Sequence, residues 1–164
     1  MPKILFIQPT QYSEKGHGLI QQRRLFLPGL VFPLLAAMTP PEWSVEVCLE
    51  AIEDVPFDSD ADIVGIGAMG QAVFRAIDIA TEFKKRGKTI VMGGYMPSMM
   101  PDLVAPHCDS LIIGDAEIAW PKFLDDYKKG TLQKVYRERV DDLSQLPLPR
   151  YEILTGKKIG FMLP

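Results

Sequence analysis

The chain has 164 residues, of which 47% are hydrophobic and 24% are charged, a balance typical of one globular domain with its own core. Its formal net charge of −3 argues against a nucleic-acid-binding surface, because phosphate contacts require clustered lysine and arginine side chains. The two cysteines, Cys48 and Cys108, have no metal-ligand spacing, so neither a zinc site nor a disulfide framework is indicated.

No apolar run reaches the roughly 18 residues of a membrane-spanning helix. The amino terminus, MPKILFI, lacks the charged, apolar and cleavage regions of a signal peptide. We therefore expect a cytoplasmic protein without a membrane span.

The chain begins with an apolar strand. Residues 3–8 (KILFIQ) form a continuous apolar run, which predicts a strand buried on both faces. A long polar loop with two glycines follows over residues 9–24. Residues 28–38 (PGLVFPLLAAM) predict a helix that ends before two prolines, and residues 44–50 (SVEVCLE) alternate like an edge strand.

The middle of the chain predicts a third strand and a long helix. Residues 62–67 (DIVGIG) are apolar enough for a buried strand. Residues 71–86 carry the i, i+3, i+4 stripe of an amphipathic helix, and Gly87 follows as its carboxyl-terminal cap. The stripe consists of Val73, Phe74, Ile77, Ala80 and Phe83. Four further elements are predicted: a strand over 89–92, a short helix over 101–105, a strand over 110–113 and a helix over 118–129.

This alternation of strands and helices predicts a parallel sheet with helices on both faces. Five strands favour a flavodoxin-like (Rossmann-like), doubly wound α/β fold with the strand order 2-1-3-4-5. Such a sheet binds ligands at the carboxyl ends of its strands. Residues 132–137 could add a further strand, and residues 141–150 form a polar, proline-bearing connector.

One glycine motif invites a dinucleotide-binding interpretation. Gly65, Gly67 and Gly70 match G-x-G-x-x-G, but the first two fall inside the third strand instead of in a turn before a helix, which the pyrophosphate requires. The acidic residues of a phosphorylated receiver domain are also absent, because Gln8-Pro9 and Gly67-Ala68 stand at those strand ends. A module that binds FMN or a nucleotide remains an alternative.

Small residues follow three of the strands that open on the predicted crevice. These are Gly67-Ala68-Met69-Gly70, Gly93-Gly94 and Gly114. Each glycine could serve only a tight turn, but glycine is also favoured where a backbone approaches a ligand. Three such sites on one rim indicate a large ligand held by main-chain groups.

Five stretches, taken in order, carry a family resemblance: Gln8-Pro9, LPGLVFPLLAA (27–37), DIVGIG (62–67), VMGGYMP (91–97) and IGDAE (113–117). Together they resemble the amino-terminal cobalamin-binding domain of cobalamin-dependent radical S-adenosylmethionine enzymes. That family writes the last two approximately as V-x-G-G-x-H-P and G-E-G-E. The resemblance extends to LSQLPLP (143–149), so it covers nearly the whole chain.

The resemblance implies a cobalamin-binding domain over residues 1–130. Residues 131–164 would then be a connector toward a radical S-adenosylmethionine domain that is absent from this chain. The implied cofactor-binding residues are Gln8, Pro9, Gly67, Ala68, Met69, Gly70, Gly93, Gly94, Tyr95, Met96, Pro97, Gly114, Asp115 and Glu117. Asp115, Ala116 and Met96 depart from the family pattern, which keeps open a cofactor-free scaffold domain of the same family.

The chain lacks C-x-x-x-C-x-x-C, and two scattered cysteines cannot hold a four-iron four-sulfur cluster. The cluster and S-adenosylmethionine are therefore expected only in the downstream domain. This chain alone would bind cobalamin without catalysis. The resemblance implies that the full-length protein is a methyltransferase-like or cyclase-like enzyme acting on an unknown small-molecule substrate.

The sequence predicts no protein histidine on cobalt. The D-x-H-x-x-G signature of cobalt-ligating domains is not matched at His17, which has no aspartate two residues earlier, and His107 lies away from the predicted rim. We expect Tyr95, Met96 or Met69 to cover the lower face of the corrin ring instead.

Asp115 and Glu117 allow two interpretations. They suit the N-cap and first turn of a helix that starts near Ile118. The resemblance makes them candidate acceptors for hydroxyl or amide groups of the cofactor. We expect no catalytic acid–base pair here.

Overall fold

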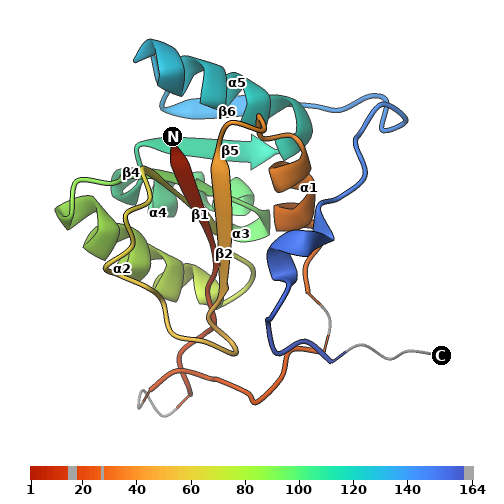
Figure 1. Cartoon of the computed structure of the whole chain (residues 1–164). Coiled ribbons are helices and arrows are strands. Elements are labelled where there is room, and N and C mark those ends of the chain that lie inside the picture. The colour runs from red at the N-terminus through yellow and green to blue at the C-terminus, as the bar shows by residue number, and fades with distance from the viewer. Residues whose placement is uncertain (15–17, 27, 161–164) are drawn as a thin grey trace.

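The computed structural model describes residues 1–14, 18–26 and 28–160. Their strands form one parallel sheet in the order β2-β1-β3-β4-β5-β6 (Figure 1). The strands are β1 (Lys3–Gln8), β2 (Ser44–Leu49), β3 (Ile63–Gly67), β4 (Thr89–Gly93), β5 (Ser110–Gly114) and β6 (Val135–Glu138). The predicted flavodoxin-like α/β fold and the order 2-1-3-4-5 are confirmed. β6 extends that order by one strand and overlaps residues 132–137, where the sequence allows a further strand.

Helices cover both faces of this sheet (Figure 1). On one face lie α1 (Val31–Ala37) and α5 (Ala116–Lys129), together with the short helix η2 (Tyr151–Leu154). On the other face lie α2 (Ala72–Lys85), α4 (Pro101–Val104) and the short helix η1 (Ala105–His107). No helix in the described ranges has the length and apolar character needed to cross a membrane.

The continuous apolar run of β1 follows from its position between the two helical layers. Ile4 and Phe6 belong to the hydrophobic cluster beneath α1 and α5, whereas Leu5 and Ile7 belong to the cluster beneath α2. Successive side chains of a strand point to opposite faces, so a strand with both faces covered must be apolar throughout. β1 is thus covered on both faces, and in the sheet it lies between β2 and β3.

The structure adds a helix that the sequence did not predict. α3 (Tyr95–Met99) begins directly after β4, where Gly94 has φ of +100°. The main-chain N–H of Met96 donates to the Ala68 carbonyl over 3.2 Å. Five residues are too few to display an apolar stripe, so this helix depends on its contacts with the β3 and β4 ends. α5 also begins two residues earlier than predicted.

The carboxyl-terminal part of the expected connector packs against α1. The main-chain N–H of Arg150 donates to the Pro33 carbonyl over 2.9 Å, and Leu154 is buried in the core cluster. Leu25 and Ile159 form an isolated parallel bridge. This segment therefore braces α1 and the loop before it. The domain boundary at residue 130 stays a prediction.

The loop after β1 is tied to the sheet by a buried ion pair. Glu50, only 1% exposed, accepts hydrogen bonds from Arg75 Nε and Nη2 over 2.8 and 2.6 Å. Its other oxygen accepts from the main-chain N–H of Thr10 over 3.1 Å. The Tyr12 hydroxyl donates to Asp78 on α2. These bonds fix the path by which the chain leaves β1.

Helix α2 offers a matched test of the core. Phe83 is fully buried and Phe74 is 57% exposed on the same helix. We expect Phe83→Ala to lower the free energy of unfolding by roughly 3–5 kcal/mol through cavity formation, whereas Phe74→Ala should change it by less than about 0.5 kcal/mol. Urea denaturation measures both variants, and equal losses would contradict this packing.

The buried ion pair offers a second test. Arg75→Ala leaves Glu50 charged and unpaired, so it should cost about 3–5 kcal/mol of unfolding free energy. The control is Arg86→Ala: Arg86 also lies 5.9 Å from the Phe57 ring, but it is exposed and pairs with the half-buried Glu82. The control should lose no more than about 1 kcal/mol in the same denaturation experiment. If Arg75→Ala loses no more unfolding free energy than the control, the Arg75–Glu50 ion pair does not stabilise the loop after β1.

Candidate functional site

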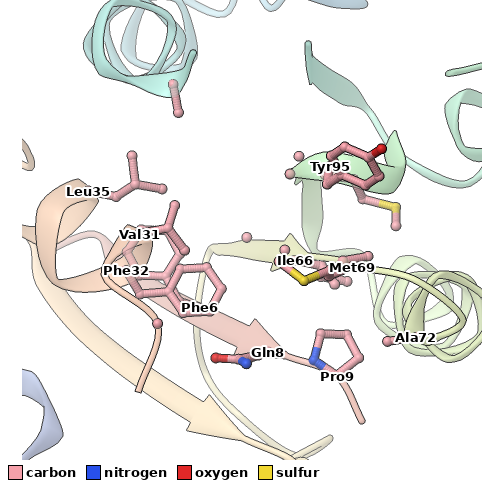
Figure 2. Close-up of a pocket in the computed structure, with 18 of the residues that line it drawn as sticks. Phe6, Gln8, Pro9, Val31, Phe32, Leu35, Ile66, Met69, Ala72 and Tyr95 are labelled. Atoms are coloured by element: carbon pink, nitrogen blue, oxygen red, sulfur yellow. The ribbon is translucent and has the colours of Figure 1, made fainter. Parts of the chain in front are cut away.

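A cavity of about 550 Å³ opens where the predicted crevice lies. It reaches from the carboxyl ends of β1, β3 and β4 down between the sheet, α1 and α5. In Figure 2, Phe6, Val31, Phe32 and Leu35 line one side, and Met69 and Tyr95 line the other. Gln8 and Pro9 lie together at the end of β1. The volume is that of a pocket for a ligand the size of a cofactor fragment or a drug.

The cavity exists because the sheet beneath it carries glycine. Gly65, Gly67 and Gly93 alternate with residues of the opposite core, so they occupy the face that α1 and α5 cover. Gly67 pairs with Gly93 in neighbouring strands. Two adjacent positions at the rim thus have no side chain, and a ligand can lie directly against the strand backbone.

Gly65, two residues before Gly67 in β3 and farther from the rim, has a different role. It pairs with Phe6 and Val91 in the adjoining strands. A Cβ atom at Gly65 would lie 2.8 Å from Cδ1 of Phe6, which is closer than packed carbon atoms allow. Gly65 therefore lets the Phe6 ring lie across β3.

Three aromatic side chains form the inner wall. The rings of Phe6 and Phe32 are stacked with centroids 5.0 Å apart, and the centroids of Phe6 and Trp120 are 5.2 Å apart. The Trp120 indole N–H donates to the Thr39 hydroxyl over 3.0 Å, and this hydroxyl donates to the Leu35 carbonyl over 2.8 Å. The bonds to Thr39 fix the indole, so the wall is rigid and apolar.

The rim is polar and belongs largely to the loop after β1. Gln8, Thr10, Gln11 and Gln22 line the cavity there. Tyr12 and Leu19 form an antiparallel bridge in this loop. Burial and the hydrogen bond to Asp78 raise the pKa of Tyr12, so its hydroxyl stays protonated as the donor to Asp78.

The turn after β3 supplies main-chain donors next to the rim. Within the described ranges, the main-chain N–H groups of Met69 and Gly70 have no hydrogen-bond partner in the protein. Met69 lines the cavity and its side chain is 75% exposed. These groups can donate to a polar ligand without breaking an existing bond.

The structure gathers eight of the fourteen predicted binding residues around this cavity. They are Gln8, Pro9, Gly67, Ala68, Met69, Gly93, Gly94 and Tyr95. The other six, which do not line it, are Gly70, Met96, Pro97, Gly114, Asp115 and Glu117. Met96 packs against the core beneath α2, and Pro97 is buried.

In the stretch Gly114-Asp115-Ala116-Glu117, some residues stabilise the start of α5 and one lines the cavity. Asp115 occupies the N-cap position of α5 without a side-chain capping bond, and its Oδ2 instead accepts from the Val140 N–H over 3.1 Å. Glu117 lies in the first turn. Gly114 has φ of +82°, a left-handed backbone conformation that favours glycine. Ala116, between the two acids, lines the cavity.

Sequence reasoning missed most of the inner wall. Those residues are Phe6, Phe32, Leu35, Gly65, Val91, Ile112, Ala116 and Trp120. The loop residues Thr10, Gln11, Ile20 and Gln22 were missed as well. A signal was present for one of them, because Gly65 lies two residues before Gly67 in the same strand and so faces the same side. The other wall residues gave no such signal, because an apolar residue that faces a cavity has the same sequence pattern as one in the core.

No protein metal site is evident in the described part of the chain. It holds no group of three or more histidine, cysteine or acidic side chains that could bind a metal ion. His107 lies in η1 with its Nδ1 3.4 Å from the Thr81 hydroxyl, away from the cavity. His17 lies outside the described residues. Burial raises the pKa of Cys48 to about 12 and that of Cys108 to about 11, so both remain neutral thiols at pH 7.

No protein-family model matches the chain. It is 38% identical over 104 residues to bacteriochlorophyllide d C-8(2)-methyltransferase of Chlorobaculum tepidum, a match of 63% of this chain and 23% of that protein. It is 31% identical over 137 residues to bacteriochlorophyllide d C-12(1)-methyltransferase of the same organism, covering 82% of this chain and 29% of the relative. An uncharacterized methyltransferase of Synechocystis sp. is 27% identical over 151 residues, 89% of this chain and 28% of that protein.

The chain thus spans between a fifth and a third of the length of each of these curated relatives. Two of the three alignments cover more than four fifths of this chain, so the shared region includes most of the sheet. The chain is related to methyltransferases.

Proposed function

We propose that this chain binds cobalamin at the carboxyl ends of β1, β3 and β4. The observation that carries the proposal is the cavity itself: an apolar slot over a glycine-bearing part of a flavodoxin-like sheet. The nucleotide tail of the cofactor would enter this slot, and the corrin ring would lie over the rim. The relationship to methyltransferases supports this assignment, because cobalamin can carry a methyl group.

The inner part of the cavity suits the base of the nucleotide tail. A benzimidazole is flat and largely apolar, and the rings of Phe6, Phe32 and Trp120 offer it an apolar aromatic wall. Gly67 and Gly93 leave the strand backbone bare, so the ribose and phosphate can pass close to the sheet. The residues present therefore fit the tail of this cofactor.

The rim suits the corrin ring. Its periphery carries amide side chains, which match Gln8, Gln11 and Gln22 as hydrogen-bond partners. Met69 and Tyr95 are 75% and 62% exposed at the mouth, and both are large enough to cover the lower face of a macrocycle. Burying such exposed apolar surface favours binding. Met96, by contrast, would act through the core that supports α3.

The chain's own residues would bind and orient the cofactor and exclude water from its lower face. Bound cobalamin would supply methyl-group transfer. The rest of the reaction belongs to the proposed full-length protein. There, by resemblance, a downstream domain would bind S-adenosylmethionine and a four-iron four-sulfur cluster. We infer a methyltransferase for the full-length protein, acting on a small-molecule substrate.

A binding experiment tests the proposal. The 164-residue chain, incubated with hydroxocobalamin and passed through a desalting column, should retain about one equivalent, measured by visible absorbance. Gly93→Val should reduce the affinity at least tenfold, because its side chain enters the cavity. The added Cβ would lie 3.5 Å from Ile112, an ordinary contact, so the fold should persist.

The matched control is Arg137→Val, which places valine at an exposed position of the edge strand β6. It should bind as the unchanged chain does. Circular dichroism would establish that both variants fold. Retention of FMN in place of cobalamin would favour the flavodoxin-like alternative, and retention of neither would favour a cofactor-free scaffold domain.

The cobalt environment gives a further prediction. If the tail lies in the cavity and no histidine binds cobalt, no nitrogen is an axial ligand. The electron paramagnetic resonance spectrum of the bound cofactor, reduced to cobalt(II), should then lack the splitting that an axial nitrogen causes. His17→Ala should leave that spectrum unchanged. An axial nitrogen signal that disappears in His17→Ala would show a protein ligand and overturn this part of the proposal.

A further inference from the structure

We infer that the cavity discriminates among cobamides by their lower base, accepting benzimidazole bases and rejecting adenine. This inference rests on the proposed function, because it assumes that the nucleotide tail occupies the cavity. It concerns a separate property, namely which base the inner wall tolerates. The distribution of polar groups along the cavity carries it.

Every polar side chain that lines the cavity lies at its rim. Gln8 is the last residue of β1 and Tyr95 is the first residue of α3. The others, Thr10, Gln11 and Gln22, belong to the loop after β1. A ligand group at the mouth can therefore form hydrogen bonds to these side chains. A ligand group deeper than the strand ends cannot reach them.

The inner wall is apolar on all sides. Phe6 and Val91 come from the sheet, Phe32 and Leu35 from α1, and Trp120 from α5, each no more than 7% exposed. Ile112 of β5 completes this wall. Among the described lining residues, no inner side chain offers a free donor or acceptor to a base.

The polar atoms closest to the inner wall are already paired. The Trp120 indole N–H is bound to the Thr39 hydroxyl, and that hydroxyl donates to the Leu35 carbonyl. The main-chain groups of β3 and β4 point along the sheet, where β3 pairs with β1 and β4, and β4 pairs with β3 and β5. A base at the inner wall would thus meet almost no unpaired polar group.

In an apolar aromatic cavity, stacking and hydrogen bonding affect the choice of base differently. Stacking on aromatic rings favours any flat base, because every base has a π-face, so Phe6, Phe32 and Trp120 should not discriminate. Hydrogen bonding does discriminate, since buried polar groups without partners are costly. Adenine has an exocyclic amine and several ring nitrogens, whereas the dimethylbenzimidazole edge carries methyl groups. The apolar wall therefore favours benzimidazole.

The test compares three probes on the 164-residue chain: cobalamin, the adenine-containing cobamide and cobinamide, which lacks the nucleotide. Dissociation constants come from equilibrium dialysis with absorbance detection. We expect cobalamin to bind at least tenfold more tightly than the adenine cobamide, which corresponds to about 1.4 kcal/mol. Cobinamide should also bind at least tenfold more weakly than cobalamin.

The outcomes separate this inference from the proposed function. Equal affinities for cobalamin and the adenine cobamide would overturn the inference while leaving cobalamin binding intact. Cobinamide binding as tightly as cobalamin would also overturn it, because the tail would then lie outside the cavity. Failure of all three probes to bind would refute the proposed function itself.

A pair of variants tests the role of the wall. Val91→Thr keeps the shape of the side chain and adds a hydroxyl to the inner cavity, so it should reduce the preference for cobalamin over the adenine cobamide by threefold or more. Val64→Thr is the control, because Val64 is equally buried but faces the core beneath α2. Its ratio should stay that of the unchanged chain. An unchanged ratio in a folded Val91→Thr would place the base elsewhere and contradict the inference.

Discussion

The candidate site depends on glycine in the two central strands of a sheet that is otherwise packed on both faces. In a doubly wound fold, the strands carry apolar side chains on each side and helices cover them. A side chain at Gly67 would place its Cβ atom 3.2 Å from Phe32. Because these side chains are missing, α1 and α5 cover the sheet without filling the space above it.

The same constraint explains the composition of the helices around the cavity. α1 presents Phe32 and Leu35, and α5 presents Ala116 and Trp120. The rings of Phe32 and Trp120 each contact the Phe6 ring and line the inner wall, while the small side chain of Ala116 leaves space beside them. Aromatic packing therefore supports the helices where the sheet offers no side chains. The cavity is thus an unfilled part of the core, and the contacts among its aromatic lining residues hold the surrounding helices in place.

The loop after β1 forms the polar rim, and charge fixes its position. Its first turn is bound to the buried Glu50, which the half-buried Arg75 neutralises. The carboxyl-terminal segment meets the other end of this loop through Leu25 and Ile159. A loop held at both ends can keep several glutamine side chains at the cavity mouth. It also connects the mouth to the carboxyl-terminal segment that packs against α1.

The sequence by itself determined the α/β class, the order of the first five strands and the end of the sheet where the cavity opens, because apolar periodicity and the positions of glycine are local signals. Only the tertiary structure decided which of the strand-end residues face the cavity. Met69 and Tyr95 lie at its mouth, whereas Met96 turns into the core and Asp115 binds the Val140 N–H. It also decided that Phe32 and Trp120 form a wall, since a buried ring has the same local pattern whether it contacts another side chain or an open space.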